Sequence, residues 1–273
     1  MFNSREIQPR LKSQGFSISE IVKALSCSEF KAYYQPKVEL FGLDLSGLEV
    51  LVRWKHPELG VLTPDKFLHT VIAGGLLNEM TRSLLDQALI FQKRLACRSI
   101  RTAMAINLEP SQVTDSGFIR AFIAQANSHD ITNNALTIEI TERANESLSF
   151  PKFARNSAKL KAAGFSVSID DFGIGYSSLE RVCKTPCSEI KIDRVFVENM
   201  CSDVQYRKMI ELMVNIGSTL QLNVVAEGIE TLQQLNLLQS LGCHHGQGHL
   251  FSAALPSEQI EQWCIKWSGC IFP

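Results

Sequence analysis

Asp170 and Asp171 stand side by side where an apolar segment, Phe165 to Ile169, meets a glycine-rich run at 172–178. The end of one predicted strand therefore carries two carboxylates, and neither has a basic neighbour in the sequence. Two carboxylates that lie close together do not both stay ionised unless a cation compensates them. Either one of the pair is protonated, or a metal ion binds between them.

Further acids, amides and one lysine occupy other strand-like segments of the chain: Glu49, Asn107, Glu139, Lys191, Glu227 and Gln247. A lysine or a glutamate between two isoleucines, as at Lys191 and Glu139, is costly to bury without a partner. Taken singly, a polar residue at a strand end is more often a turn or capping residue than a ligand. Taken together, these residues favour one shared site.

Strand-like and helical segments alternate along most of the chain. Strands are predicted at 30–38, 47–54, 102–108, 136–141, 165–171, 189–192, 223–226 and 247–251, and helices at 18–27, 77–95, 118–126, 151–163, 204–220, 231–241 and 256–267. The link between the first two strands is too short for a parallel crossover, so we expect these strands to be antiparallel. The remaining order, strand then helix, predicts an α/β fold, a TIM-type (β/α)8 barrel with one antiparallel strand.

The composition agrees with one such barrel, which typically takes about 250 residues. The chain has 273 residues, of which 45% are hydrophobic and 20% charged. We expect a tail at 1–19 and a single domain at 20–273. A net charge of −1 argues against a nucleic-acid surface, and no apolar run is long enough to span a membrane. Without an apolar leader we expect no signal peptide and a cytoplasmic location.

The eight cysteines are scattered without a Cys-x-x-Cys pair, and we interpret them as reduced thiols. The run Cys243-His244-His245 lacks the second ligand pair that a zinc site requires.

Active sites of barrels lie at the C-terminal ends of the strands. Closing the predicted barrel would bring Glu49, Glu139, Asp170, Asp171 and Glu227 together there, with Lys191 as the one compensating cation. Oxygen ligands of this kind suit magnesium or manganese better than zinc. The sequence therefore predicts a site that binds divalent metal ions.

The residues that form these patterns resemble the EAL-domain family, bacterial proteins that hydrolyse the second messenger cyclic di-GMP. The resemblance covers roughly residues 20–260. It is seen in Tyr34-Gln35-Pro36, Glu49-Val50-Leu51-Val52-Arg53-Trp54, Asn107-Leu108, Glu139-Ile140-Thr141-Glu142, Asp170-Asp171-Phe172-Gly173, Lys191-Ile192-Asp193, the segment Ala226 to Thr231, and Gln247-Gly248.

The resemblance implies a role for each of these residues. Glu49, Asn107, Glu139 and Asp170 would bind one Mg²⁺ or Mn²⁺ ion, and Asp170, Asp171 and Glu227 would bind or orient a second. Lys191 would position or deprotonate the attacking water, with Glu227 as the other catalytic residue. Gln35, Leu51 and Arg53 would contact cyclic di-GMP, Gln247 would order water at the substrate site, and Glu142 would anchor the loop 171–177. The expected product is linear pGpG, and the family further implies a homodimer.

The sequence departs from the family pattern at several positions outside this set. Ile174 replaces the usual Thr of the loop after the two aspartates, Ile72 a common glutamate, His249 an aromatic residue, and Glu109 a common Ser. Some members of the family have lost catalysis and act as cyclic di-GMP sensors or protein-binding regulators. Such members usually lack one or more of the acids, and all are present here. Two alternatives stay open, a sensor with a regulatory protein partner and a metal-dependent phosphodiesterase for another substrate.

Overall fold

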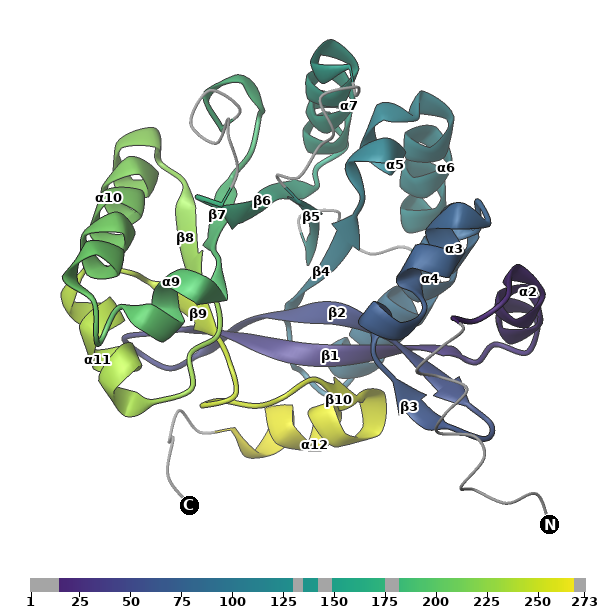
Figure 1. Cartoon of the computed structure of the whole chain (residues 1–273), viewed down its shortest axis with the longest axis horizontal. Coiled ribbons are helices and arrows are strands. Elements are labelled where there is room, and N and C mark those ends of the chain that lie inside the picture. Colours follow the sequence, from purple (N-terminus) through teal and green to yellow (C-terminus); the bar gives the residue numbers. More distant parts are fainter. Residues whose placement is uncertain (1–14, 130–134, 142–148, 175–181, 268–273) are drawn as a thin grey trace.

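The computed structural model describes residues 15–129, 135–141, 149–174 and 182–267. Figure 1 shows strands that form a central ring with helices around it. The strands are β1 (Phe30–Glu39), β2 (Leu45–His56), β3 (Gly60–Leu62), β4 (Ala103–Leu108), β5 (Leu136–Thr141), β6 (Ser166–Phe172), β7 (Glu189–Ile192), β8 (Asn223–Ala226), β9 (His245–Gln247) and β10 (Leu255–Pro256). The helices are α2 (Ile18–Ser26), α3 (Leu68–Ala73), α4 (Leu77–Ala96), α5 (Pro110–Thr114), α6 (Ser116–Asn127), α7 (Phe150–Ala162), α9 (Arg194–Asn199), α10 (Val204–Leu220), α11 (Leu232–Ser240), α12 (Ser257–Lys266) and the 3-10 turn η1 (Pro64–Lys66).

The ring is a closed barrel in which one strand runs against the others. Around it the order is β1-β9-β8-β7-β6-β5-β4-β2, and pairing of β1 with β2 closes it. β1 is antiparallel to both of its neighbours in the ring, whereas the other pairs are parallel. The predicted barrel with one antiparallel strand is therefore confirmed. β3 and β10 add short antiparallel pairings beside β2 and β1.

The predicted eighth strand exists, but its predicted bounds, 247–251, are wrong. β9 covers His245–Gln247, and the chain then turns across the segment after β8, where Leu250 N donates to Ile229 O at 2.9 Å. Gly248 lies so close to the backbone of Ile229 that a Cβ atom there would clash with it. Phe251 is an apolar residue that suggests a strand. It lies in this turn instead, and its side chain is buried. The short elements β3, η1, α3, α5, α9 and β10 are not predicted by the sequence patterns.

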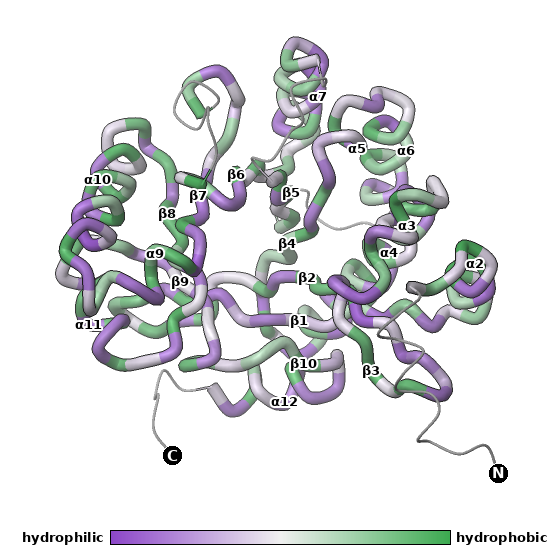
Figure 2. Tube along the Cα trace, viewed as in Figure 1, coloured by the Kyte–Doolittle hydropathy of each residue, from purple (hydrophilic) through white to green (hydrophobic). Residues whose placement is uncertain are grey.

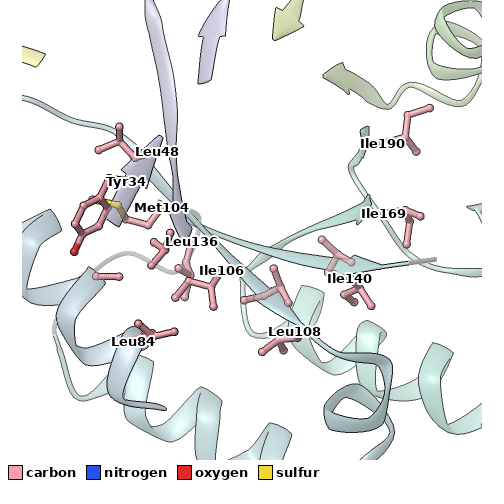
Figure 3. Packing of buried hydrophobic residues seen from close by; sticks show 14 of the residues in the cluster. Tyr34, Leu48, Leu84, Met104, Ile106, Leu108, Leu136, Ile140, Ile169 and Ile190 are labelled. Atoms are coloured by element: carbon pink, nitrogen blue, oxygen red, sulfur yellow. The ribbon is translucent and has the colours of Figure 1, made fainter. Parts of the chain in front are cut away.

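Strand alternation divides the barrel into an apolar outer face and a polar inner face. On β4, Met104, Ile106 and Leu108 are buried, and Figure 3 shows them with Leu84 of α4 in the layer between sheet and helices. Ile140, Ile169 and Ile190 occupy the same layer on the following strands. Figure 2 shows hydrophobic and hydrophilic residues interleaved along these helices, which pack on the barrel with one face. The hydrophobic core thus lies outside the strands, and the interior is left to polar side chains.

Local capping fixes the segment that follows β8. Thr231 Oγ1 accepts from Gln234 N at 3.2 Å, and Gln234 Oε1 accepts from Thr231 N at 2.9 Å. This reciprocal pair begins α11. Gln234 Oε1 also accepts from Glu230 N at 2.8 Å, so the turn that carries Glu227 is tied to the helix start. None of the helices in the described ranges is both long and apolar enough to cross a membrane.

Candidate active site

Lys191 is the centre of the polar cluster inside the barrel. Its side chain on β7 is 1% exposed, and its Nζ lies 2.6 Å from Glu227 Oε1 and 2.8 Å from Glu139 Oε2. Asp170 Oδ1 and Glu49 Oε2 lie slightly farther away, at 3.4 and 3.5 Å. Four acids from four parts of the barrel wall therefore surround one ammonium group. The structure brings these predicted residues together.

Two side-chain amides complete the cluster. Asn107 Nδ2 on β4 donates to Glu49 Oε1 at 2.8 Å. Gln247 Nε2 on β9 donates to Glu49 Oε2 at 2.6 Å and to Glu227 Oε1 at 3.1 Å. Both carboxylate oxygens of Glu49 are thus fixed by hydrogen bonds. Gln247 also links Glu49 to Glu227, two acids that are distant in the sequence.

Two of the four acids, Glu139 and Glu227, have raised pKa values. Burial raises the pKa of Glu227 to about 8, and the charges of Asp170 and Glu49 also raise it against the effect of Lys191. Burial likewise raises the pKa of Glu139 well above its usual range. Burial alone would lower the pKa of Lys191, but the surrounding acids raise it well above the ordinary value. The cluster has an excess of negative charge that a further cation would relieve.

A distortion of β6 sets the positions of the paired aspartates. The pairing of β6 with β7 shifts register between Ile169 and Phe172, which is the stretch that contains both acids. Asp171 has φ of +56°, a left-handed conformation that is uncommon outside glycine, and its N donates to Asp170 Oδ1 at 3.0 Å. Such irregularities re-aim side chains at the ends of strands. Asp170 contacts Lys191, whereas the structure does not place Asp171 within ion-pair distance of it.

The donor set fits a hard divalent cation. Its members are carboxylate oxygens and amides, with no histidine or thiol among them, and oxygen donors of this kind bind Mg²⁺ and Mn²⁺. In the described residues, no three acidic, histidine or cysteine side chains are arranged to hold a metal ion as they stand. The Lys191 ammonium itself lies among the carboxylate oxygens of the cluster.

The three predicted substrate-contacting residues of β1 and β2 lie on the same wall as Glu49. Gln35 is the register partner of Glu49, and alternation places Leu51 and Arg53 farther along the same face of β2. Gln35 Nε2 donates to Ser252 O at 3.2 Å, and Arg53 is half-buried. Arg53 Cζ also lies 5.9 Å from the ring centroid of Tyr33, a neighbour that the sequence motifs did not indicate. Only the pairing register of β1 with β2 identifies Tyr33.

The remaining predictions concern the rim and the cysteines. Glu142 lies outside the described residues, as do residues 175–177 of the loop that it is predicted to anchor. Ile174 is 42% exposed, and its N donates to Asp171 O at 3.3 Å. Cys243 is fully buried, and burial raises its pKa to about 12, so it is a packing residue.

Comparison with known proteins agrees with this geometry. The family model of the EAL domain matches residues 18–254. RocR of Pseudomonas aeruginosa, named a cyclic di-GMP phosphodiesterase, is 36% identical over 249 residues, which are 91% of this chain and 63% of RocR. NbdA of the same organism, with the same activity in its name, is 32% identical in an alignment that covers 96% of this chain and 34% of NbdA. The chain thus spans less than two thirds of the length of these relatives.

Among solved structures, that of the PaMucR phosphodiesterase in complex with c-di-GMP superposes with a TM-score of 0.83 at 33% identity. The match covers 89% of this chain and 98% of that one. The family match extends over nearly all of the barrel and includes every residue of the cluster around Lys191. The chain therefore belongs to the EAL domain family.

Proposed function

We propose that this protein hydrolyses cyclic di-GMP to linear pGpG with the help of divalent metal ions, two by family resemblance. The observation that supports this most is the convergence of Glu49, Glu139, Asp170 and Glu227 on Lys191 inside the barrel. Relatives with this domain are named for the same activity. Mg²⁺ or Mn²⁺ bound here would supply a water of lowered pKa and would neutralise the phosphodiester anion.

In this proposal Glu49, Asn107, Glu139 and Asp170 hold one ion, and Asp170, Asp171 and Glu227 hold or orient the second. Lys191 reaches Glu139 and Glu227 at once, and its ammonium can hold an attacking water or stabilise the charge that develops on the phosphate. Gln247 keeps Glu49 and Glu227 a fixed distance apart. Arg53, at the edge of the same wall, has the charge and the planar donor group to bind a phosphate.

The direct test is incubation of the purified protein with cyclic di-GMP and Mg²⁺ or Mn²⁺, followed by chromatography of the products. We expect pGpG to accumulate with time. Binding of cyclic di-GMP without product would instead support a sensor with a regulatory partner. Hydrolysis of other phosphodiesters at equal or higher rate would contradict the choice of substrate. A homodimer, which the family resemblance implies, and a cytoplasmic location, which the sequence pattern predicts, both stay predictions.

Replacement of Ile174 by Thr is expected to raise turnover several-fold. Thr would restore one side-chain hydrogen bond, typically worth about 0.5–1.5 kcal/mol, in the loop after the two aspartates. The side chain is 42% exposed, so the melting temperature should change little. The measurement is steady-state hydrolysis of cyclic di-GMP by both proteins at equal metal concentration. Ile174→Val, which has nearly the same shape as Thr without its hydroxyl, is the control, and an equal gain from Val would rule out the hydrogen bond.

A further inference from the structure

A buried ion pair forms a second polar layer in the barrel, on the side of the Lys191 cluster toward the N-terminal ends of the parallel strands. Lys37 Nζ on β1 lies 2.7 Å from Glu189 Oε2 on β7, and the two side chains are 10% and 8% exposed. Alternation places Glu189 two residues before Lys191 on the same inner face. An ammonium group has three donors, and this ion pair uses one of them.

Gln247 joins this layer to the Lys191 cluster. It is the register partner of Lys37 across β9 and β1, so the two side chains start side by side. Gln247 is 5% exposed, and its Nε2 donates to Glu49 and Glu227. Its Oε1 is buried without any partner among the described residues. The opposite amide orientation would point Oε1 at two carboxylate oxygens, so the observed orientation is the favourable one.

A small cavity lies between the two layers. Its volume is about 10 Å³, and its lining includes Lys37, Gln247, Glu139 and Glu49, with Gly47 and Ala105 as the small residues that leave the space. To hold one water molecule, a cavity needs about 10–15 Å³ of space that the centre of the water can occupy. It also needs polar partners, which the Lys37 ammonium and the Gln247 carbonyl provide. The space therefore fits one buried water.

We propose that one water molecule occupies this cavity, accepts a hydrogen bond from Lys37 Nζ and donates one to Gln247 Oε1. Lys37 is then a positioning residue: through the water it fixes the amide of Gln247, which in turn fixes Glu49 and Glu227. Glu189 holds the Lys37 ammonium in place from the other side. The role in turnover rests on the proposed hydrolysis of cyclic di-GMP, whereas the water itself does not.

The first test is a crystal structure of the wild-type protein at a resolution that locates buried water. We expect a density peak within about 2.7–3.2 Å of both Lys37 Nζ and Gln247 Oε1. An empty cavity, or a Lys37 ammonium bonded directly to Gln247, would overturn the proposal. This result does not depend on whether the protein hydrolyses cyclic di-GMP.

The second test separates positioning from a structural role of the ion pair. Lys37→Met leaves Glu189 buried without its partner, so loss of activity in that variant alone would be ambiguous. The double variant Lys37→Met/Glu189→Met removes both charges, and such apolar replacements of buried ion pairs are often neutral or stabilising. We expect it to fold with a melting temperature near that of the wild type and to lose about 10–100-fold in kcat/KM, as loss of an outer-shell partner does.

The matched control is Arg94→Met/Glu261→Met, which removes an ion pair of 3.2 Å on the outside of the barrel and should leave kcat/KM unchanged. Wild-type kcat/KM in the Lys37/Glu189 double variant would show that the ion pair is only structural. A crystal structure of that variant should lack the water and show a reoriented Gln247. If the wild type has no phosphodiesterase activity, the proposed function fails first, and the two crystal structures still decide the buried water.

Discussion

Excess chelator is expected to abolish turnover of cyclic di-GMP, and added Mg²⁺ or Mn²⁺ to restore it. Four acids share the single ammonium of Lys191, and burial with mutual repulsion raises the pKa values of Glu139 and Glu227. A substrate that is itself a phosphodiester anion would be repelled by such a cluster unless a cation reverses the local field. In the proposed mechanism, metal removal would take away both substrate attraction and the activated water.

The same experiment has a readout that does not require activity. A cation that binds the folded protein only stabilises it, so Mg²⁺ or Mn²⁺ should raise the melting temperature of chelator-treated protein in a concentration-dependent way. Ca²⁺ should also raise it but inhibit hydrolysis, since its larger and looser coordination does not suit an in-line displacement. Undiminished turnover in excess EDTA would refute the metal requirement.

Lys191→Ala is expected to lower kcat by about 10²–10⁴-fold, the usual contribution of a positioned proton donor or acceptor. With saturating metal, binding of cyclic di-GMP should stay largely intact, because the metal ions attract the phosphates. Glu49→Ala should weaken both binding and turnover, since it removes a proposed metal ligand that two amides hold in place. Steady-state kinetics and calorimetric binding measure the two effects separately.

Loss of stability must be distinguished from loss of chemistry in this variant. Lys191 is the shared partner of four acids, two of them buried, so without metal the Ala variant should melt at a lower temperature than the wild type. Lys208→Ala on the exposed face of α10 is the matched control and should change neither property. Wild-type turnover by Lys191→Ala would show that the buried lysine has only a structural role.

The barrel and most of the cluster could be predicted from the sequence because both follow from local patterns. Apolar strands predict which segments form the wall, and a charged residue inside such a strand, as at Glu139 or Lys191, must face a polar interior. The sequence alone does not show that Lys191 contacts four acids at once, because these contacts depend on the register between strands. The register shift at Asp170 and Asp171 had no signal of its own in the sequence.

The errors have physical reasons as well. The apolar residues Leu250 and Phe251 predict a longer final strand, but close packing of Gly248 on Ile229 turns the chain there. Arg53 contacts Tyr33 across two strands, and Lys37 lies opposite Gln247 on the neighbouring strand. Such neighbours on different strands cannot be found within a single segment of the sequence. The cost of burying a polar group predicts which face of a strand a residue lies on. Its partners on other strands are known only once the closed barrel is known.

Barrel closure has a consequence for the order in which the chain folds. β1 is the first of the barrel strands in sequence order, yet it pairs with β9 and β10 near the end of the barrel, as Lys37 with Gln247 and Tyr33 with Pro256. Contacts between residues so distant in the sequence form slowly, because a long stretch of chain must be ordered first. During synthesis, one edge of β1 in the β1–β2 hairpin therefore stays unpaired until β9 and β10 have been made. Unpaired strand edges promote aggregation. We expect nascent chains that end before β9 to depend on chaperones, whereas complete chains protect that edge themselves.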